Sequence, residues 1–466
     1  MEETAHSAYG WSLHEYGFTD CNDERLTKRG VDIGAKFLQH PQQSIPQSCG
    51  DWASTKATYR FFDNKKVKST KMLEAHQRQM LKRAAKCRTL LYLHDTSALN
   101  LSGIKKMQGK GSIGGGTSTG LFLHPGLIVD PKGGIPVGLG SFELYARDEK
   151  TRDPEYKKKA AKLPVTEKES GRWIRAITRG AQILQDKHIV FISDRESDIF
   201  EVFREVKRVG QDAIIRTKQN RLLEEIDPRG EKHKLFDKIL EGEIITTYET
   251  EVPIDHHRTR KAILTIRKAT VTLLPSLRQK GQEGITVTVL NVMEENPPEE
   301  YKKEPIHWRL TTTLPVTNTE EAKTVVLWYI YRWRIERFFF TLKTGAFNVE
   351  KLQFETFERF EKALTMYAIA ACRIIFTQYY EREHPLDDAA TIFSMDEITM
   401  LCLKTNKDEP YRMTVHEAVV ATAKLGGYLA RKNDGPPGIK ALWIGFQTLN
   451  NLVDGMLLGK KLQFKN

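Results

Sequence analysis

The sequence has few cysteines and no long apolar run, and both absences narrow what the protein can be. The five cysteines (Cys21, Cys49, Cys87, Cys372 and Cys402) are scattered without a CxxC pair. This argues against a zinc module or a disulfide framework and fits a reducing compartment. No stretch approaches the length that spans a bilayer, and the first residues lack the apolar segment of a signal peptide. We therefore expect a cytoplasmic protein with no membrane partner.

Acidic residues are outnumbered, with 60 Asp and Glu against 72 Lys and Arg, a formal net charge of +12. The excess is concentrated between Lys56 and Arg88, where only Asp63 and Glu74 oppose a run of basic residues. Lys and Arg displace counterions from phosphates, so a basic cluster favours a nucleic-acid partner. A solvated helix face is the alternative, and charge alone does not decide between them.

A chain of 466 residues is too long for one ordinary core, so we expect several domains. Residues 1–85 show helical periodicity. From about residue 88, short apolar strands alternate with helices, which indicates an α/β layer with a mixed sheet. We predict a helical domain over 1–85, a catalytic domain over 86–350 with a β-rich insertion at about 222–315, and a helical domain over 351–466.

Three carboxylates stand out by their context. Asp95 and Asp194 each end an apolar strand, in "TLLYLHDTS" and "HIVFISDRES", and Glu336 lies on a helix predicted for residues 318–345. Strands are rigid enough to hold ligands in place, and Mg²⁺ prefers oxygen ligands, so these acids could hold one or two ions. Taken singly, each acid is better explained as a turn cap or a surface residue.

The predicted helix strengthens the case for Glu336. Tyr329, Arg332, Glu336 and Lys343 fall along one stripe of a continuous helix, which thus carries a lone acid among groups that can bind phosphates. A solvated charged face is the alternative. A second stripe is apolar and is expected to pack on the core: Leu327, Tyr331, Ile335, Phe338 and Leu342.

The segment "YIYRWRIERFFFTLK" resembles the Y-(2)-R-(3)-E-(6)-K signature of cut-and-paste DDE transposases of the insertion-sequence-four family. "LHDTSALN" and "SDRESDIF" are similar to the first and second aspartate motifs of that family. "SIPQSCGDWASTKATYRFF" is similar to its end-binding region, and "ATAKLGGYLARK" to its dimerisation region. The resemblance covers nearly the whole chain. Each motif alone is weak, but their combination in this order is specific.

The resemblance implies a ribonuclease H-like mixed-sheet core of the α/β class with a β-rich insertion, flanked by helical N- and C-terminal domains. Asp95, Asp194 and Glu336 would be catalytic and would hold two Mg²⁺ ions, with Mn²⁺ as a substitute. The expected enzyme excises a mobile element and joins it to a new site. Its partners would be transposon-end DNA, target DNA and a second copy of the chain, and in a bacterial cell it would be associated with the nucleoid when bound to DNA.

The resemblance also assigns DNA-binding roles to seven side chains: Tyr329, Arg332, Lys343, Arg216, Trp308, Arg25 and Arg29. Trp308 falls where the family has a tryptophan that stacks on a flipped base; a strand residue facing the core explains it equally well. The sequence departs from the family at Phe340, where a basic DNA contact is expected.

Two other functions remain open. One is a DNA-binding descendant without catalysis, such as a transposition inhibitor or a domesticated transposase. The intact set of acids and the basic stripe disfavour it. The other is a metal-dependent, structure-specific nuclease, which would share the core but would not join strands.

Overall fold

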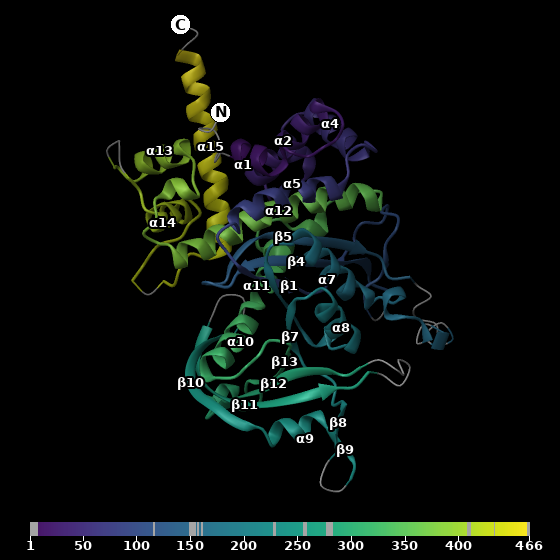
Figure 1. Ribbon diagram of the computed structural model, residues 1–466. Coiled ribbons are helices and arrows are strands. Elements are labelled where there is room, and N and C mark those ends of the chain that lie inside the picture. The colour runs from purple at the N-terminus through teal and green to yellow at the C-terminus, as the bar shows by residue number, and fades with distance from the viewer. Residues whose placement is uncertain are drawn as a thin grey trace.

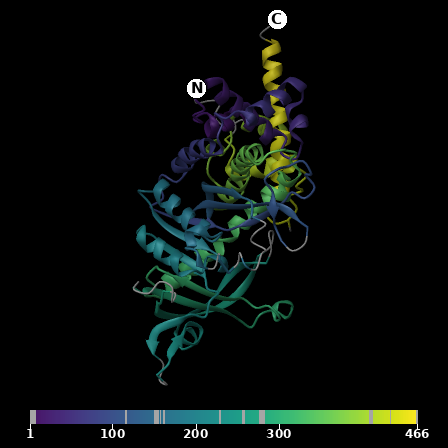
Figure 2. The same cartoon turned by 90° about the vertical axis from the view of Figure 1, so that its right-hand side faces the viewer.

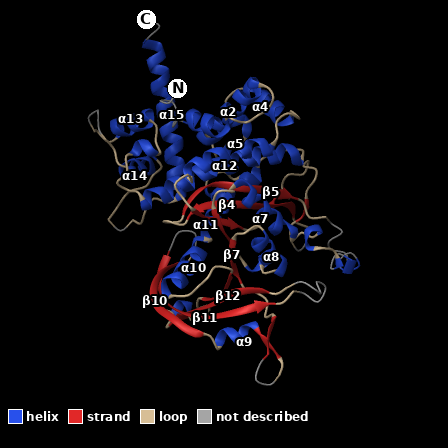
Figure 3. Cartoon of the chain, viewed as in Figure 1, coloured by secondary structure: helices blue, strands red, loops and turns tan. Residues whose placement is uncertain are grey.

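In the computed structural model, helical regions from both ends of the chain lie together above a large sheet (Figures 1 and 3). The structure describes residues 8–114, 117–148, 155, 158–159, 162–226, 230–254, 259–275, 283–407, 412–432 and 434–463. The fold therefore belongs to the mixed α/β class, as the sequence predicts.

The N-terminal region is helical. Its helices are α1 (Ala8–Tyr16), α2 (Glu24–Gln39), α3 (Ile45–Cys49), α4 (Trp52–Asp63) and α5 (Ser69–Arg83). The side chain of Asp23 accepts a hydrogen bond from the Arg25 amide at the start of α2, and Asp51 caps α4 in the same way. Such caps satisfy amides that have no partner within the helix.

Five strands form the centre of the sheet: β1 (Thr89–His94), β4 (Thr119–Asp130), β5 (Ile135–Tyr145), β6 (His188–Ser193) and β7 (Asp212–Arg216). They lie in the order β5-β4-β1-β6-β7; β4 is antiparallel to β5 and β1, whereas β6 and β7 continue parallel to β1. This order, with its one reversed strand, is the ribonuclease H-like arrangement. The short strands β2 (Ser97–Asn100) and β3 (Gly111–Ser112) also pair with β4.

Helices cover both faces of this sheet, so its central strands are apolar along their length. They are α7 (Gly171–Ile183), α8 (Phe200–Arg208) and α12 (Phe357–Glu383). Helix α12 packs against β5 and also against α2, α4 and α5, so it joins the N-terminal helices to the sheet (Figure 1). The Phe37 ring stacks on Tyr367 at this junction, with centroids 4.2 Å apart.

The segment between β7 and the next helix is rich in strands, as expected. It contains β8 (Leu222–Ile226), β9 (Lys232–Lys234), α9 (Leu235–Leu240), β10 (Glu243–Pro253), β11 (Thr259–Leu273), β12 (Ile285–Glu295) and β13 (His307–Thr312). Strand β13 pairs antiparallel with β7. The insertion therefore continues the core sheet, and the described part of the chain forms one sheet of thirteen strands.

The prediction of one continuous helix over residues 318–345 is wrong. The segment is divided into α10 (Thr319–Tyr331), α11 (Trp333–Phe340) and a π-helical turn, η6 (Thr341–Gly345). At Arg332 the backbone (φ −51°, ψ −31°) tightens toward 3₁₀ geometry, and the Arg332 side chain enters a buried ion pair described below. The predicted apolar stripe fails at one end, since Leu327 is 41% exposed.

The C-terminal region forms a helical cluster of its own from α13 (Met395–Lys404), α14 (Val415–Leu425) and α15 (Ile439–Gln463). The end of α15 projects beyond the rest of the molecule (Figures 1 and 2). Within the residues that the structure describes, no helix has the length and apolar character needed to cross a membrane.

Candidate active site

The two aspartates predicted from the sequence lie at the same edge of the sheet. Asp95 directly follows β1 and Asp194 directly follows β6, and these strands are parallel neighbours. Each carboxylate is oriented by a backbone amide of its own turn. Thr96 N–H donates to Asp95 Oδ1 at 2.7 Å, and Glu196 N–H donates to Asp194 Oδ1 at 2.9 Å.

Helix α11 brings Glu336 to the same place through Arg332. Arg332 Nη1 lies 2.9 Å from Asp95 Oδ2 and 3.3 Å from Glu336 Oε1, so one guanidinium joins both carboxylates. Burial raises the pKa of Asp95 to about 7; Arg332 opposes this shift, whereas the neighbouring charges of Asp194 and Glu336 add to it. The three predicted acids are therefore close enough to repel one another.

The chemistry of the three side chains suits a hard divalent cation, because each offers carboxylate oxygens. Among the described residues, no group of three or more His, Cys, Asp or Glu side chains is already arranged to hold a metal ion. In this structure the cation that bonds Asp95 and Glu336 is the Arg332 guanidinium.

Besides Arg332, three of the predicted DNA-binding residues join this site: Tyr329, Arg216 and Trp308. Tyr329 is 3% exposed; burial raises the pKa of its hydroxyl, Arg332 and Arg216 lower it, and Asp194 raises it. The hydroxyl thus lies among these charges. The half-buried Trp308 packs edge-on against the Tyr329 ring, with centroids 5.5 Å apart.

Lys343 also lies near the site, but on the π-helical turn rather than on a helical stripe. Its ammonium donates to Ser97 Oγ at 2.7 Å and to the Ala98 carbonyl at 2.5 Å, in the segment that follows Asp95. Burial lowers the pKa of Lys343, and the charges of Glu350 and Glu336 oppose that shift.

Arg25 and Arg29 are not brought to the carboxylates. Both are on α2, which packs on the far side of α12 from β5 (Figure 1). Arg25 is fully accessible at its side chain and pairs with Asp23, while Arg29 lies 3.8 Å from Asp32.

Two further arginines adjoin the site and were missed by the sequence argument. Arg195 follows Asp194 directly. Burial lowers the pKa of Arg216 and of Arg309, and the charge of Arg195 lowers both further. Arg309 stacks over the Phe236 ring at 4.1 Å. Within the described ranges neither Arg195 nor Arg309 has an acidic partner. Arg195 could have been found from the sequence, because it lies in the motif "SDRES" beside Asp194. Arg309 could not, because only the placement of β13 in the sheet brings it to the site.

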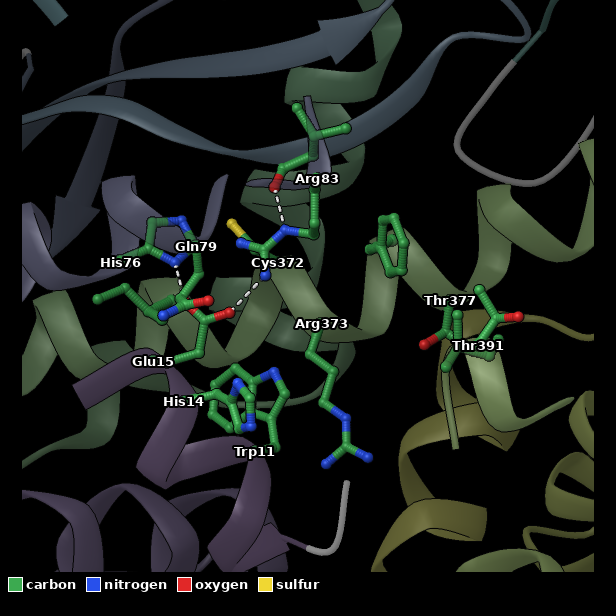
Figure 4. A pocket seen from close by; sticks show the side chains of 14 residues that line it. Trp11, His14, Glu15, His76, Gln79, Arg83, Cys372, Arg373, Thr377 and Thr391 are labelled. Carbon is green, nitrogen blue, oxygen red and sulfur yellow. Dashed lines mark hydrogen bonds and ion pairs between the residues drawn. The ribbon is translucent and has the colours of Figure 1, made fainter. Parts of the chain in front are cut away.

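A separate cavity of about 180 Å³ lies between α1, α5, β5 and α12, away from the carboxylates (Figure 4). At its wall, Glu15 accepts from Arg83 Nη1 at 2.6 Å and bonds His76 Nδ1 at 2.5 Å. The Leu139 amide donates to the other ring nitrogen of His76 at 2.9 Å. Burial raises the pKa of Glu15, but Arg83 and His76 outweigh it and hold that pKa at about 2. These groups satisfy one another's hydrogen-bonding capacity, which indicates a structural contact between α1, α5 and β5.

Three known families match successive parts of the chain. Residues 8–67 match the family described as transposase DNA-binding, residues 171–373 match the transposase DDE domain, and residues 369–462 match the transposase Tn5 dimerisation domain. Asp194 and Glu336 lie inside the second match, whereas Asp95 precedes it. Together with the sheet order and the three carboxylates, these matches define the chain as a DNA transposase of the DDE class. Its match to the Tn5 dimerisation domain, beside the DNA-binding and DDE matches, places it with transposases of the Tn5 type.

A solved structure of the piggyBac transposase in a synaptic complex with hairpin DNA also aligns with the chain. The identity is 8% and the TM-score 0.36, over 95% of this chain and 82% of that one. A similarity this weak supports no conclusion about fold or function.

Proposed function

We propose that this transposase belongs to the insertion-sequence-four family, close to the transposase of transposon five, and performs cut-and-paste transposition. The observation that carries the proposal is the convergence of Asp95, Asp194 and Glu336, from three separate elements, around Arg332. The charges of Asp194 and Glu336 raise the pKa of Asp95, and acids placed this close are costly to gather without a cation, which favours a metal-dependent site over a structural one.

Asp95, Asp194 and Glu336 would hold two Mg²⁺ ions, with Mn²⁺ as a substitute. Such ions would activate an attacking oxygen and stabilise a leaving oxygen at phosphorus. Arg332 acts as the counter-ion that keeps Asp95 and Glu336 together in the free protein. Once those charges are neutralised by a stronger cation, its guanidinium is available to a DNA phosphate.

The reaction would proceed by nicking one strand at the transposon end. The freed 3′-hydroxyl would then attack the opposite strand to form a hairpin, and after the hairpin is opened it would join to target DNA. Arg216 and Lys343 would bind phosphates beside the scissile bond, and Trp308, supported by the Tyr329 ring, would stack on an extruded base.

Recognition of the end would begin at the N-terminal helices, where Arg25 and Arg29 are accessible. Synapsis would use the C-terminal helices of two copies. Leu458 and Leu462, near the end of α15, are 61% and 66% exposed, which suits a contact with a second copy. We also propose the domain limits 1–85, 86–350 and 351–466, and a place of action at the bacterial nucleoid.

One assay tests this function against its alternatives. Wild-type protein is incubated with paired transposon ends, Mg²⁺ and a target plasmid, and the products are scored for nicks, hairpins and joined DNA. We expect all three products, and we expect Asp95→Ala, Asp194→Ala and Glu336→Ala each to abolish them while end binding persists. Cleavage without joining would identify a nuclease instead, and cleavage that survives in any of the three variants would refute the assigned ligands.

A further inference from the structure

Arg172, on the first turn of α7, contacts both the turn that follows β1 and the turn that follows β6, which carry Asp95 and Asp194. Helix α7 packs closely on the sheet, since a Cβ at Gly180 would lie 2.7 Å from the Tyr92 ring. Trp173 and Ile177 are fully buried on the same helix. Arg172 is itself only 6% exposed, so its guanidinium is held by the protein rather than by solvent.

The three nitrogens of this guanidinium bind three different segments. Nε donates to Thr96 Oγ1 at 2.8 Å, Nη2 to Glu196 Oε2 at 2.7 Å, and Nη1 to the Glu169 carbonyl at 2.9 Å. Thr96 is the residue after Asp95, and its amide binds that carboxylate. Glu196 lies two residues after Asp194, and its amide binds that carboxylate in turn. The Arg172 guanidinium therefore connects Thr96 and Glu196, the two residues whose amides orient Asp95 and Asp194.

Hydrogen-bond donors and acceptors extend the network to a buried histidine. A guanidinium nitrogen can only donate, so Thr96 Oγ1 accepts from Arg172, and the same oxygen is hydrogen-bonded to His124 Nδ1, 2.9 Å away. The Thr96 hydroxyl is thus fixed from both sides.

We infer that Arg172 is a positioning residue that fixes the separation of Asp95 and Asp194 by fastening the turn after β1 to the turn after β6. The inference rests on the proposed function, in which both aspartates are metal ligands. Groups that orient metal ligands change metal affinity or activity by roughly 10- to 100-fold when they are removed. The planar fork is essential, because a lysine at this position keeps the charge but cannot reach Thr96 and Glu196 together.

The test compares Arg172→Lys with Arg175→Lys. Arg175 lies one turn further along α7 and forms an exposed pair with Glu143, which makes it a matched control. Mn²⁺ binding to the full-length protein in complex with end DNA is followed by the loss of the free-ion spin-resonance signal. Binding by an Asp95→Ala/Asp194→Ala variant is subtracted as background. We expect Arg172→Lys to weaken Mn²⁺ binding and to raise the Mg²⁺ concentration for half-maximal cleavage by roughly 10- to 100-fold, with Arg175→Lys unchanged.

Two variants that leave Arg172 in place guard against a folding defect. Thr96→Val removes the hydroxyl but not the volume and should reproduce the Mn²⁺ defect, whereas Thr96→Ser should restore wild-type binding. End-DNA affinity and its salt dependence should be unchanged in Arg172→Lys. A lowered end affinity with normal Mn²⁺ binding would identify Arg172 as a phosphate contact and overturn the inference, as would normal Mn²⁺ binding by Thr96→Val. If the double aspartate variant binds Mn²⁺ as wild type does, the proposed function itself fails.

Discussion

At the scale of single residues, the site depends on how its charges are compensated. Asp95 is almost completely buried, and an isolated carboxylate there would be costly. Arg332 supplies one positive charge to Asp95 and Glu336 together. One guanidinium thus faces two carboxylates, so the cluster can accommodate further positive charge. A divalent cation would supply that charge, and the arginines beside the cluster, Arg195 and Arg216, would then be available to phosphates.

Trp308 gives a residue-scale prediction. Its ring rests against Tyr329 beside the carboxylates rather than deep in the core, which suits a stacking platform. Trp308→Ala should slow hairpin formation roughly 5- to 150-fold, because stacking of an extruded base contributes about 1–3 kcal/mol. The first nick should be little affected. Single-turnover cleavage of labelled end DNA resolves the two steps, and equal slowing of both would mean that Trp308 only supports the fold.

Glu15 gives a prediction about pH. Its pKa is about 2 in the folded protein, below its ordinary value of 4.5. A lowered folded-state pKa contributes stability above pH 4.5, and this stability is lost as the pH falls toward 2. The contribution is on the order of 3 kcal/mol. Glu15→Gln should therefore be less stable than wild type at pH 7, with a difference that shrinks by pH 3. Urea unfolding at both pH values measures this, and a pH-independent difference would contradict the expected ionisation.

At the scale of secondary-structure elements, the sequence predicted what depends on local pattern. Strands β1 and β6 are continuous apolar runs, and α7 carries an apolar stripe, so periodicity identifies them. The ion pair of Arg332 could not be predicted, because its partner Asp95 is 237 residues away in the sequence. Arg172 was missed for the same reason, since its contacts with Thr96 and Glu196 exist only when the sheet is assembled.

Helix α12 gives a prediction at this scale, because it joins the N-terminal helices to the sheet. Tyr367 is fully buried and stacks on Phe37, and its hydroxyl has no hydrogen-bond partner among the residues that the structure describes. Tyr367→Ala should destabilise the protein by about 3–5 kcal/mol through the cavity it creates. Tyr367→Phe should be neutral or stabilising, because it removes a buried polar group. Chemical unfolding compares the two, and a large loss in the phenylalanine variant would show that the hydroxyl is satisfied.

At the scale of the whole molecule, the excess of basic residues predicts binding to DNA that weakens steeply with salt. Each phosphate contact contributes about 0.9 to the slope of log affinity against log salt. Arg216→Ala should therefore lower the slope by roughly that amount. Arg208→Ala, which removes an exposed arginine paired with Glu205, serves as the control. Titration of labelled end DNA at several salt concentrations gives both slopes, and equal slopes for Arg216→Ala and wild type would exclude a phosphate contact.

A change of ligand chemistry can decide whether the carboxylates at the sheet edge bind the metal ions that cut DNA. Asp194→Cys replaces a hard oxygen ligand with sulfur, which Mg²⁺ binds poorly and Mn²⁺ tolerates better. We predict that Asp194→Cys binds transposon ends normally, fails to cleave them in Mg²⁺ and regains cleavage in Mn²⁺, while Asp194→Ala is inactive with either ion. Cleavage by Asp194→Cys in Mg²⁺ at the wild-type rate, or an identical response of both variants to Mn²⁺, would contradict the assignment of Asp194 as a metal ligand.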